Sequence, residues 1–158
     1  MQAAAPSVTH VLETSLYVAD LDRAQAFYQR LFGFPPFFRD RHMAALGVPG
    51  AQVLLLFRHG AAAGGSMAAG GTIPPHDGSG RLHLCFAIAD GDLAAWQRRL
   101  AEHAIAIESR VDWPRGSVSL YFRDPDQHLL ELATPRLWPN YPPAGVAAMA
   151  PGADPDAR

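Results

Sequence analysis

The sequence has little of several features that would assign it to other classes of protein. It contains one cysteine, Cys85, so no disulfide can form within the chain. Its 13 Lys and Arg against 15 Asp and Glu give a net charge of −2, which provides no basic surface for nucleic acid or an anionic membrane. Residues 1–7 lack the positive charge and the apolar stretch of a signal peptide. We therefore expect a cytoplasmic protein that binds neither nucleic acid nor a membrane.

Long hydrophobic runs are also absent. The longest strongly apolar stretch, residues 53–57, is far shorter than the roughly 18 residues that cross a bilayer. At 158 residues, the chain is long enough for one well-packed domain or two small joined halves. It is too short for two large independent cores. We expect a soluble protein that folds as one unit.

What the sequence does contain is a pattern of strands and helices that occurs twice. Residues 11–18 alternate between apolar and polar, which predicts a half-buried strand. Apolar residues then recur at helical spacing between Asp20, a predicted N-cap, and Gly33, a predicted C-terminal residue of the helix. The remaining strands of the first half are predicted at residues 34–39, 42–46 and 51–58. In the second half we predict a strand at 81–89, a helix at 92–103, and strands at 105–111, 117–123 and 127–134.

A nearly constant offset relates the two halves. Val18-Ala19-Asp20 matches Ile88-Ala89-Asp90 at a shift of 70, and Phe27 and Leu31 match Trp96 and Leu100 at a shift of 69. We therefore predict an α+β fold in which two tandem β-α-β-β-β modules form a cupped, partly open mixed sheet. The first module is predicted at 8–58 and the second at 81–134. A Gly/Ala-rich connection without regular elements is predicted at 59–80, and a disordered or surface-bound tail at 135–158.

Three side chains are predicted to face the inside of the cup. The shift of 70 makes Glu13 and His83 equivalent, and Glu131 interrupts a strand that is otherwise nearly all apolar. An unpaired buried carboxylate costs several kcal/mol, a cost that a divalent cation or a hydrogen-bonded network offsets. Two carboxylates and an imidazole suit one divalent ion: Mn, Fe, Co, Ni or Zn. The alternative is that each of these residues is exposed or paired for structural reasons.

Further polar residues are predicted to line the same cup. Ser117, Ser119 and Tyr121 alternate with apolar residues, so their hydroxyls are placed to hydrogen-bond a substrate, or else they form an ordinary polar strand face. Arg115 lies on the preceding turn and is a candidate for binding a carboxylate or phosphonate, unless it is simply solvated. His76, in the connection, is a candidate general base, and Glu131 is a second candidate for moving a proton.

With these residues placed, the sequence resembles the vicinal oxygen chelate superfamily, which includes glyoxalases, bleomycin-resistance proteins and extradiol dioxygenases. The segments that carry the resemblance are residues 17–28 (YVADLDRAQAFY), 31–34 (LFGF) and 119–132 (SLYFRDPDQHLLEL). The resemblance runs from about residue 10 to 134. It implies the glyoxalase/bleomycin resistance/dioxygenase fold, with a metal site that is often completed between the subunits of a homodimer.

Carried over by position, the family's metal ligands fall at Glu13, His83 and Glu131. Two departures bear on the reaction. Fosfomycin-modifying members and extradiol dioxygenases usually have histidine at the first position, where this chain has Glu13. Glyoxalase I typically has a fourth ligand on the last strand of the first module, where this chain has Leu54-Leu55-Leu56.

The resemblance leaves two functions open. The first is a metal-dependent lyase, isomerase or oxygenase that acts on a small substrate with adjacent oxygens. The second is a non-catalytic protein that sequesters a drug or metabolite, as bleomycin-resistance proteins do. Such proteins generally have no need of metal ligands, so the three predicted ligands favour the enzyme.

Overall fold

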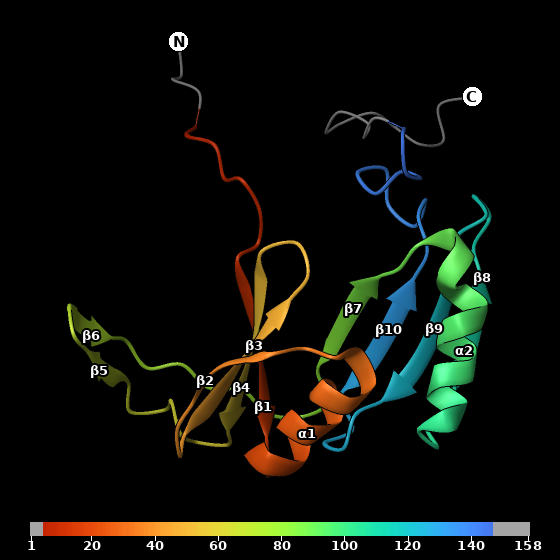
Figure 1. The fold of residues 1–158 in the computed structure, drawn as a ribbon. Helices are drawn as coiled ribbons and strands as arrows, with labels where there is room; N and C mark the ends of the chain where they lie inside the picture. The colour runs from red at the N-terminus through yellow and green to blue at the C-terminus, as the bar shows by residue number, and fades with distance from the viewer. Residues whose placement is uncertain (1–4, 147–158) are drawn as a thin grey trace. The chain divides into compact units, whose positions relative to one another are not determined.

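Each half of the chain folds around its own four-stranded sheet (Figure 1). The computed structural model describes residues 5–146, and the chain divides into two units between Ser79 and Gly80. The first unit contains β1 (Glu13–Val18), α1 (Leu21–Phe32), β2 (Pro36–Arg39), β3 (Met43–Val48), β4 (Gln52–Arg58), β5 (Ser66–Ala68) and β6 (Gly71–Ile73). The second contains β7 (His83–Ala87), a 3-10 turn at Asp90–Asp92, α2 (Leu93–Glu102), β8 (Ser109–Asp112), β9 (Val118–Arg123) and β10 (Leu129–Ala133). The predicted α+β class is confirmed, with two sheets of four strands and few helices.

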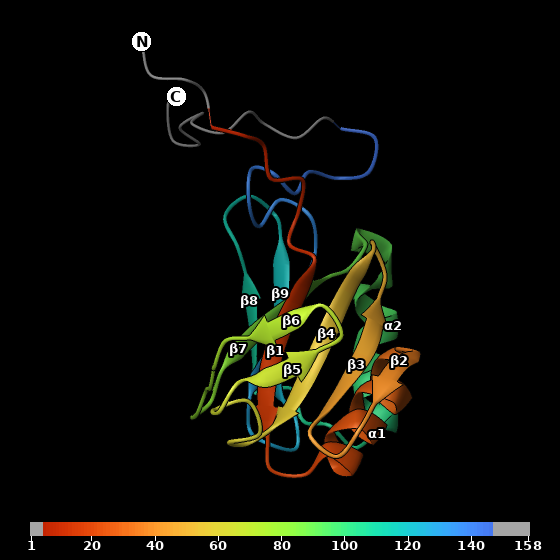
Figure 2. The ribbon, with the colours of Figure 1, turned by 90° about the vertical axis from the view of Figure 1, so that its left-hand side faces the viewer.

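The two sheets have the same topology. The strand order is β1-β4-β3-β2 in the first unit (Figure 2) and β7-β10-β9-β8 in the second. In each four-stranded sheet the strand that comes first in the sequence pairs in parallel with the strand that comes last, and the other pairings are antiparallel. Glu13 lies opposite Val53, and His83 lies opposite Leu129. This common register makes Glu13 equivalent to His83, as the offset predicts, and it makes Leu55 equivalent to Glu131.

The helix α1 begins and ends at the residues that the sequence predicts. The side chain of Asp20 accepts a hydrogen bond from the backbone N–H of Arg23 at 3.0 Å, which caps the first turn. Gly33 has a φ of 73°, a left-handed conformation that glycine adopts without strain, and its N–H bonds the carbonyl of Gln29. The helix packs against β3 and β4 through its buried stripe, which consists of Leu21, Ala24, Tyr28 and Leu31.

The alternation of side chains along the strands decides which residues enter the core. Leu16 and Val18 of β1 are buried with Leu54 and Leu56 of β4, whereas Glu13, Ser15 and Tyr17 lie on the opposite face of the same sheet. In the second unit, the buried side chains include Leu120, Phe122, Leu130 and Leu132. Each sheet therefore has one face in a core and one face that carries the polar residues of interest.

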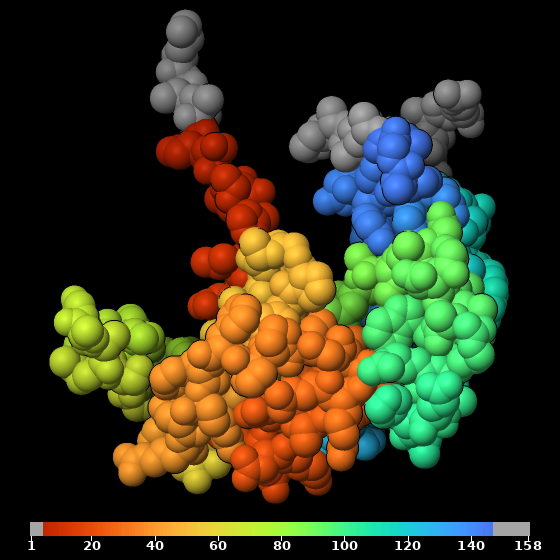
Figure 3. Space-filling view, in the orientation of Figure 1, coloured from red at the N-terminus to blue at the C-terminus, as the bar shows by residue number. Residues whose placement is uncertain are grey.

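The connection between the two sheets departs from the prediction. Residues 59–80 were expected to lack regular elements, but β5 and β6 form an antiparallel hairpin in which Ser66 lies opposite Ile73. The turn is Ala69-Gly70, and each strand has only three residues, too few for an alternation to be read from the sequence. The hairpin projects from the first unit as an arm (Figure 3).

Two further boundaries differ from the predictions. The strand predicted from residue 105 begins at Ser109, and the chain leaves α2 through Ala104, whose φ of 55° is left-handed. The described part of the predicted tail lies on the second unit, where Arg136 pairs with Asp90 at 2.9 Å and the Tyr141 hydroxyl donates to the carbonyl of Ile88. Residues 147–158 of that predicted tail lie outside the described residues. Within residues 5–146, no helix is long and apolar enough to span a membrane.

Candidate metal site

A buried carboxylate lies at the centre of the polar face of the second sheet. Strand β10 runs between β7 and β9, so each of its side chains has neighbours on both sides. Leu130 and Leu132 point into the core, and Glu131 therefore points to the other face. Glu131 is nevertheless only 4% exposed. A carboxylate with so little access to water requires partners, and the neighbouring strands provide them.

One oxygen of Glu131 is held by a chain of hydrogen bonds. The hydroxyl of Ser119, which is fully buried on β9, donates to Oε1 of Glu131 at 2.5 Å. The same hydroxyl accepts a hydrogen bond from the indole Nε1 of Trp113 at 2.8 Å. Because the indole can only donate, the Ser119 proton is directed to the carboxylate. Trp113 and Ser119 together fix the orientation of Glu131.

The other oxygen of Glu131 faces an imidazole. Nε2 of His83 lies 3.2 Å from Oε2 of Glu131, and Nδ1 of His83 lies 3.0 Å from the carbonyl oxygen of Leu129. A carbonyl only accepts hydrogen bonds, so Nδ1 carries a proton, and the neutral ring has its lone pair on Nε2. Two electron-pair donors then face each other, and either a proton on Nε2 or a cation satisfies both. Such a hydrogen-bonded second nitrogen is the usual arrangement of a metal-binding histidine. The donor set of His83 and Glu131 therefore fits a divalent ion.

Two ionisable neighbours are held in their neutral forms. Cys85 and Tyr121 lie directly opposite Glu131 on β7 and β9. Although Cys85 as a residue is exposed, its thiol is poorly solvated, and this desolvation together with the charge of Glu131 raises the pKa of the thiol to about 12. Desolvation, followed by the same charge, also raises the pKa of Tyr121. Both groups remain protonated at neutral pH.

The residues that the sequence assigns to substrate binding lie in different environments. Tyr121 is half-buried, and its ring centroid lies 6.3 Å from that of His83. Arg115 is exposed, and its guanidinium donates to the carbonyl of Leu137. Ser117 and Ser119 are both fully buried, and the hydroxyl of Ser117 donates to the carbonyl of Thr134 at 2.8 Å. The structure thus gives both serine hydroxyls partners within the protein, that of Ser119 being Glu131, and their contact with a substrate stays a prediction.

The remaining predicted residues, Glu13 and His76, belong to the first unit. Glu13 is exposed at the start of β1. Nδ1 of His76 lies 2.7 Å from the hydroxyl of Tyr17, and the His76 ring packs edge-on against Phe57 at 4.8 Å between centroids. His76 is therefore attached to the same sheet face that carries Glu13, rather than being a detached loop residue. Within either unit, no three His, Cys, Asp or Glu side chains of the described residues gather in a group that could hold a metal ion.

Two contributors to these sites were not assigned their roles from the sequence. Trp113 is six residues from Ser119 in the sequence, and Tyr17 is 59 residues from His76. Neither contact follows the short, regular spacing by which a helix can be recognised in a sequence. The position of Ser119, by contrast, can be predicted from the sequence. Ser119 alternates with Tyr121 on the strand next to Glu131, so its hydroxyl lies on the same face of the sheet as the carboxylate.

Comparisons with known proteins agree with this architecture. The model of the Glyoxalase/Bleomycin resistance protein/Dioxygenase superfamily matches residues 7–132. A crystal structure of lactoylglutathione lyase from Agrobacterium tumefaciens is 32% identical, with a TM-score of 0.76, and the alignment covers 84% of this chain and 98% of that one. A glyoxylase/bleomycin resistance protein/dioxygenase domain from Frankia sp. EAN1pec is 25% identical, with a TM-score of 0.59, over 81% of this chain and 98% of that one.

Proposed function

Because the chain belongs to the glyoxalase/bleomycin resistance protein/dioxygenase superfamily, we propose that it is a divalent-metal-dependent enzyme that acts on a small substrate with adjacent oxygens. The superfamily includes lyases and dioxygenases, and its members commonly use a divalent metal. The observation that carries the proposal is the 3.2 Å approach of His83 Nε2 to Glu131 Oε2. The remaining polar atoms of these two side chains are already held by Leu129 and Ser119, so the facing pair is left for an ion.

The residues of the second unit have distinct roles in this proposal. His83 binds the ion through Nε2, and Glu131 binds it through Oε2. When bound, a divalent ion polarises substrate oxygens and stabilises the negative charge that develops on them. The neutral hydroxyl of Tyr121 donates a hydrogen bond to the substrate, and the exposed guanidinium of Arg115 is available to an acidic substituent.

Glu13 and His76 of the first unit are proposed to complete the machinery. Glu13 is the third ligand by position, because it is equivalent to His83 in the common register of the two sheets. We also propose that the protein is a homodimer, so that Glu13 can come from the same chain or from a second copy. His76 is the proposed general base, and its hydrogen bond to Tyr17 orients its ring.

The first unit leaves the coordination of the ion open. Leu55 occupies the position equivalent to Glu131, and a leucine side chain has no atom that binds a divalent ion. Positions on the ion are then available for two substrate oxygens. The proposal is tested by assaying lactoylglutathione lyase activity and extradiol cleavage of catechols with added Mn²⁺, Fe²⁺, Co²⁺, Ni²⁺ or Zn²⁺. No turnover with any ion, in protein that binds the ion tightly, would contradict these two reactions.

One observation favours the non-catalytic alternative. The face of the first sheet that carries Glu13 is otherwise largely apolar, with Val53, Leu55 and Phe57 of β4 half-buried on it. An apolar face of this kind suits the sequestration of a drug or metabolite. The two functions make opposite predictions: an enzyme loses ligand binding and activity when the ion is removed, whereas a sequestering protein binds its ligand equally well without metal.

The role of Ser119 yields a direct test of the proposed site. We expect Ser119→Ala to weaken divalent metal binding about 10- to 100-fold, because Glu131 loses the hydrogen bond that orients it. The affinity is measured by isothermal titration calorimetry with Mn²⁺ and Ni²⁺.

The matched control for this variant is Ser117→Ala. Ser117 is equally buried on the same segment, but its hydroxyl donates to Thr134 and not to Glu131. Ser117→Ala removes the hydrogen bond to Thr134, and Ser119→Ala removes those to Glu131 and Trp113, with a cost of about 1–3 kcal/mol for each buried partner left unpaired. Only Ser119→Ala is expected to change the metal affinity, and equal effects of the two variants would contradict the positioning role of Ser119.

A further inference from the structure

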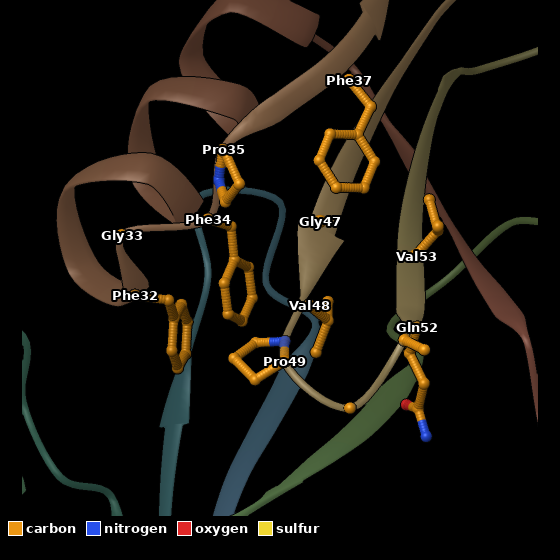
Figure 4. A pocket seen from close by; sticks show the side chains of 12 residues that line it. Phe32, Gly33, Phe34, Pro35, Phe37, Gly47, Val48, Pro49, Gln52 and Val53 are labelled. Atoms are coloured by element: carbon orange, nitrogen blue, oxygen red, sulfur yellow. The ribbon is translucent and has the colours of Figure 1, made fainter.

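An apolar cavity lies at one edge of the first unit. It has a volume of about 500 Å³ and opens between the end of α1, the start of β2 and the turn that joins β3 to β4 (Figure 4). Its wall includes the stacked rings of Phe32 and Phe34, whose centroids are 5.0 Å apart. This volume falls within the range of about 300–1,000 Å³ that is typical of small-molecule sites.

The close approach of the Phe37 ring to the backbone of Gly47 shapes this cavity. Phe37 is 66% exposed, and its ring lies over Gly47, where an added Cβ atom would be 2.3 Å from Cζ of Phe37. The N–H of Gly47 donates to the carbonyl of Pro35, which joins β3 to the segment that follows α1. The absence of a side chain at residue 47 therefore allows the Phe37 ring to approach the backbone of β3 closely and form one wall.

The lining carries no charge. Among the twelve lining residues, Gln52 has the only polar side chain, and Figure 4 shows its amide directed away from the aromatic rings. A carboxylate, phosphate or ammonium group placed here would lose water without gaining a partner, at a cost of several kcal/mol. An uncharged ring, by contrast, stacks on Phe37 and Phe34 and gains from burying its apolar surface.

The cavity also adjoins a proposed metal ligand. Val53 lines the cavity and is the partner of Glu13 in the pairing of β4 with β1. Paired residues of neighbouring strands point to the same face, and their strands are about 4.8 Å apart. Gly47, which lies opposite Val53 on β3, extends the same row to the ring of Phe37. The row Glu13, Val53, Gly47 therefore leads from a carboxylate to an aromatic wall.

We propose that this cavity binds an uncharged aromatic group of a small-molecule ligand. The binding of an aromatic group in the cavity does not depend on the proposed metal site, because every residue that forms the cavity belongs to the first unit and none is a proposed ligand.

The proposal is tested on the cavity alone. The full-length protein is treated with a chelator and titrated with the uncharged fluorophore N-phenyl-1-naphthylamine. We expect saturable binding that weakens about tenfold or more in Phe37→Ala, and partly recovers in Phe37→Leu, because the ring is the exposed wall. The control is Phe38→Ala, which removes a neighbouring ring that is 51% exposed but lies outside the cavity, and which should change the affinity less than twofold.

Two results would overturn the cavity itself. The first is an affinity for the fluorophore that is unchanged, or reduced equally, in Phe37→Ala and Phe38→Ala. The second is the absence of fluorophore binding by a wild-type oligomer that dissociates in Phe37→Ala, since a second copy of the chain would then cover this edge. The oligomeric state of each variant is measured by light scattering after size-exclusion chromatography.

Discussion

Replacing Glu131 with glutamine should lower the affinity of the protein for divalent ions at least about 100-fold, a larger loss than removal of an outer hydrogen bond produces. The amide has nearly the volume of the carboxylate, and its oxygen can still accept the hydrogen bond of Ser119. Its NH₂ group, however, then faces Nε2 of His83 and has neither a charge nor a lone pair for an ion. The metal content of protein purified without added metal, together with calorimetric titration with Mn²⁺ and Ni²⁺, measures the effect.

The matched control is Glu108→Gln. Glu108 belongs to the same unit and pairs with Arg123 at 3.1 Å, but it is exposed and is not a proposed ligand. Removing its charge should change the metal affinity less than about twofold, because a distant exposed charge is screened by water and salt. Stoichiometric metal in Glu131→Gln, with a circular dichroism spectrum like that of the wild type, would refute the assigned site.

The second prediction with a large expected effect concerns the hydrophobic core of the second unit, on the face of the sheet opposite Glu131. Phe122→Ala should lower the free energy of unfolding of the second unit by about 3–5 kcal/mol, because the ring is fully buried and its removal leaves a cavity. Phe122 follows Tyr121 on β9 and points to the opposite face, so it supports the strand that holds Ser119 and Tyr121. Hydrogen exchange of the β9 and β10 amides reports this unit directly, and urea denaturation measures the shift of the midpoint.

An exposed aromatic residue of the same unit provides the comparison for Phe122. Trp138 is 66% exposed, and Trp138→Ala should change the free energy of unfolding by less than about 1 kcal/mol. Similar midpoints for the two variants would mean that the second sheet does not depend on its buried face for stability. The fold described above would not be compatible with that result.

Much of the architecture follows from short-range patterns in the sequence. Asp20 and Gly33 mark the ends of α1 because capping is a local interaction between a residue and the nearest turn of helix. The alternation around Glu131 places it on the face opposite Leu130 and Leu132, since successive side chains of a strand point to opposite faces. The offset between the halves predicts that Glu13 and His83 are equivalent, and the strand registers agree.

Other features depend on contacts that no local pattern encodes. The sequence does not predict the hairpin of β5 and β6, because three-residue strands are stabilised by each other and show no readable period. The hydrogen bonds from Trp113 to Ser119 and from Ser119 to Glu131 require the register of β9 against β10, together with the path of the turn before β9. The attachment of His76 to Tyr17 depends on how a 22-residue connection, 59–80, returns to the first sheet.

The sequence by itself therefore determined that the chain builds two similar sheets, and that Glu13, His83 and Glu131 lie on their polar faces. Those conclusions need only the period of a strand and the comparison of two halves. Only the tertiary structure decided that His83 turns its Nε2 toward Glu131, that Ser119 serves the carboxylate, and that an aromatic cavity adjoins Glu13. These features depend on side-chain rotamers and on strands brought together from distant parts of the chain. The short-range periodicity of the sequence carries no information about either.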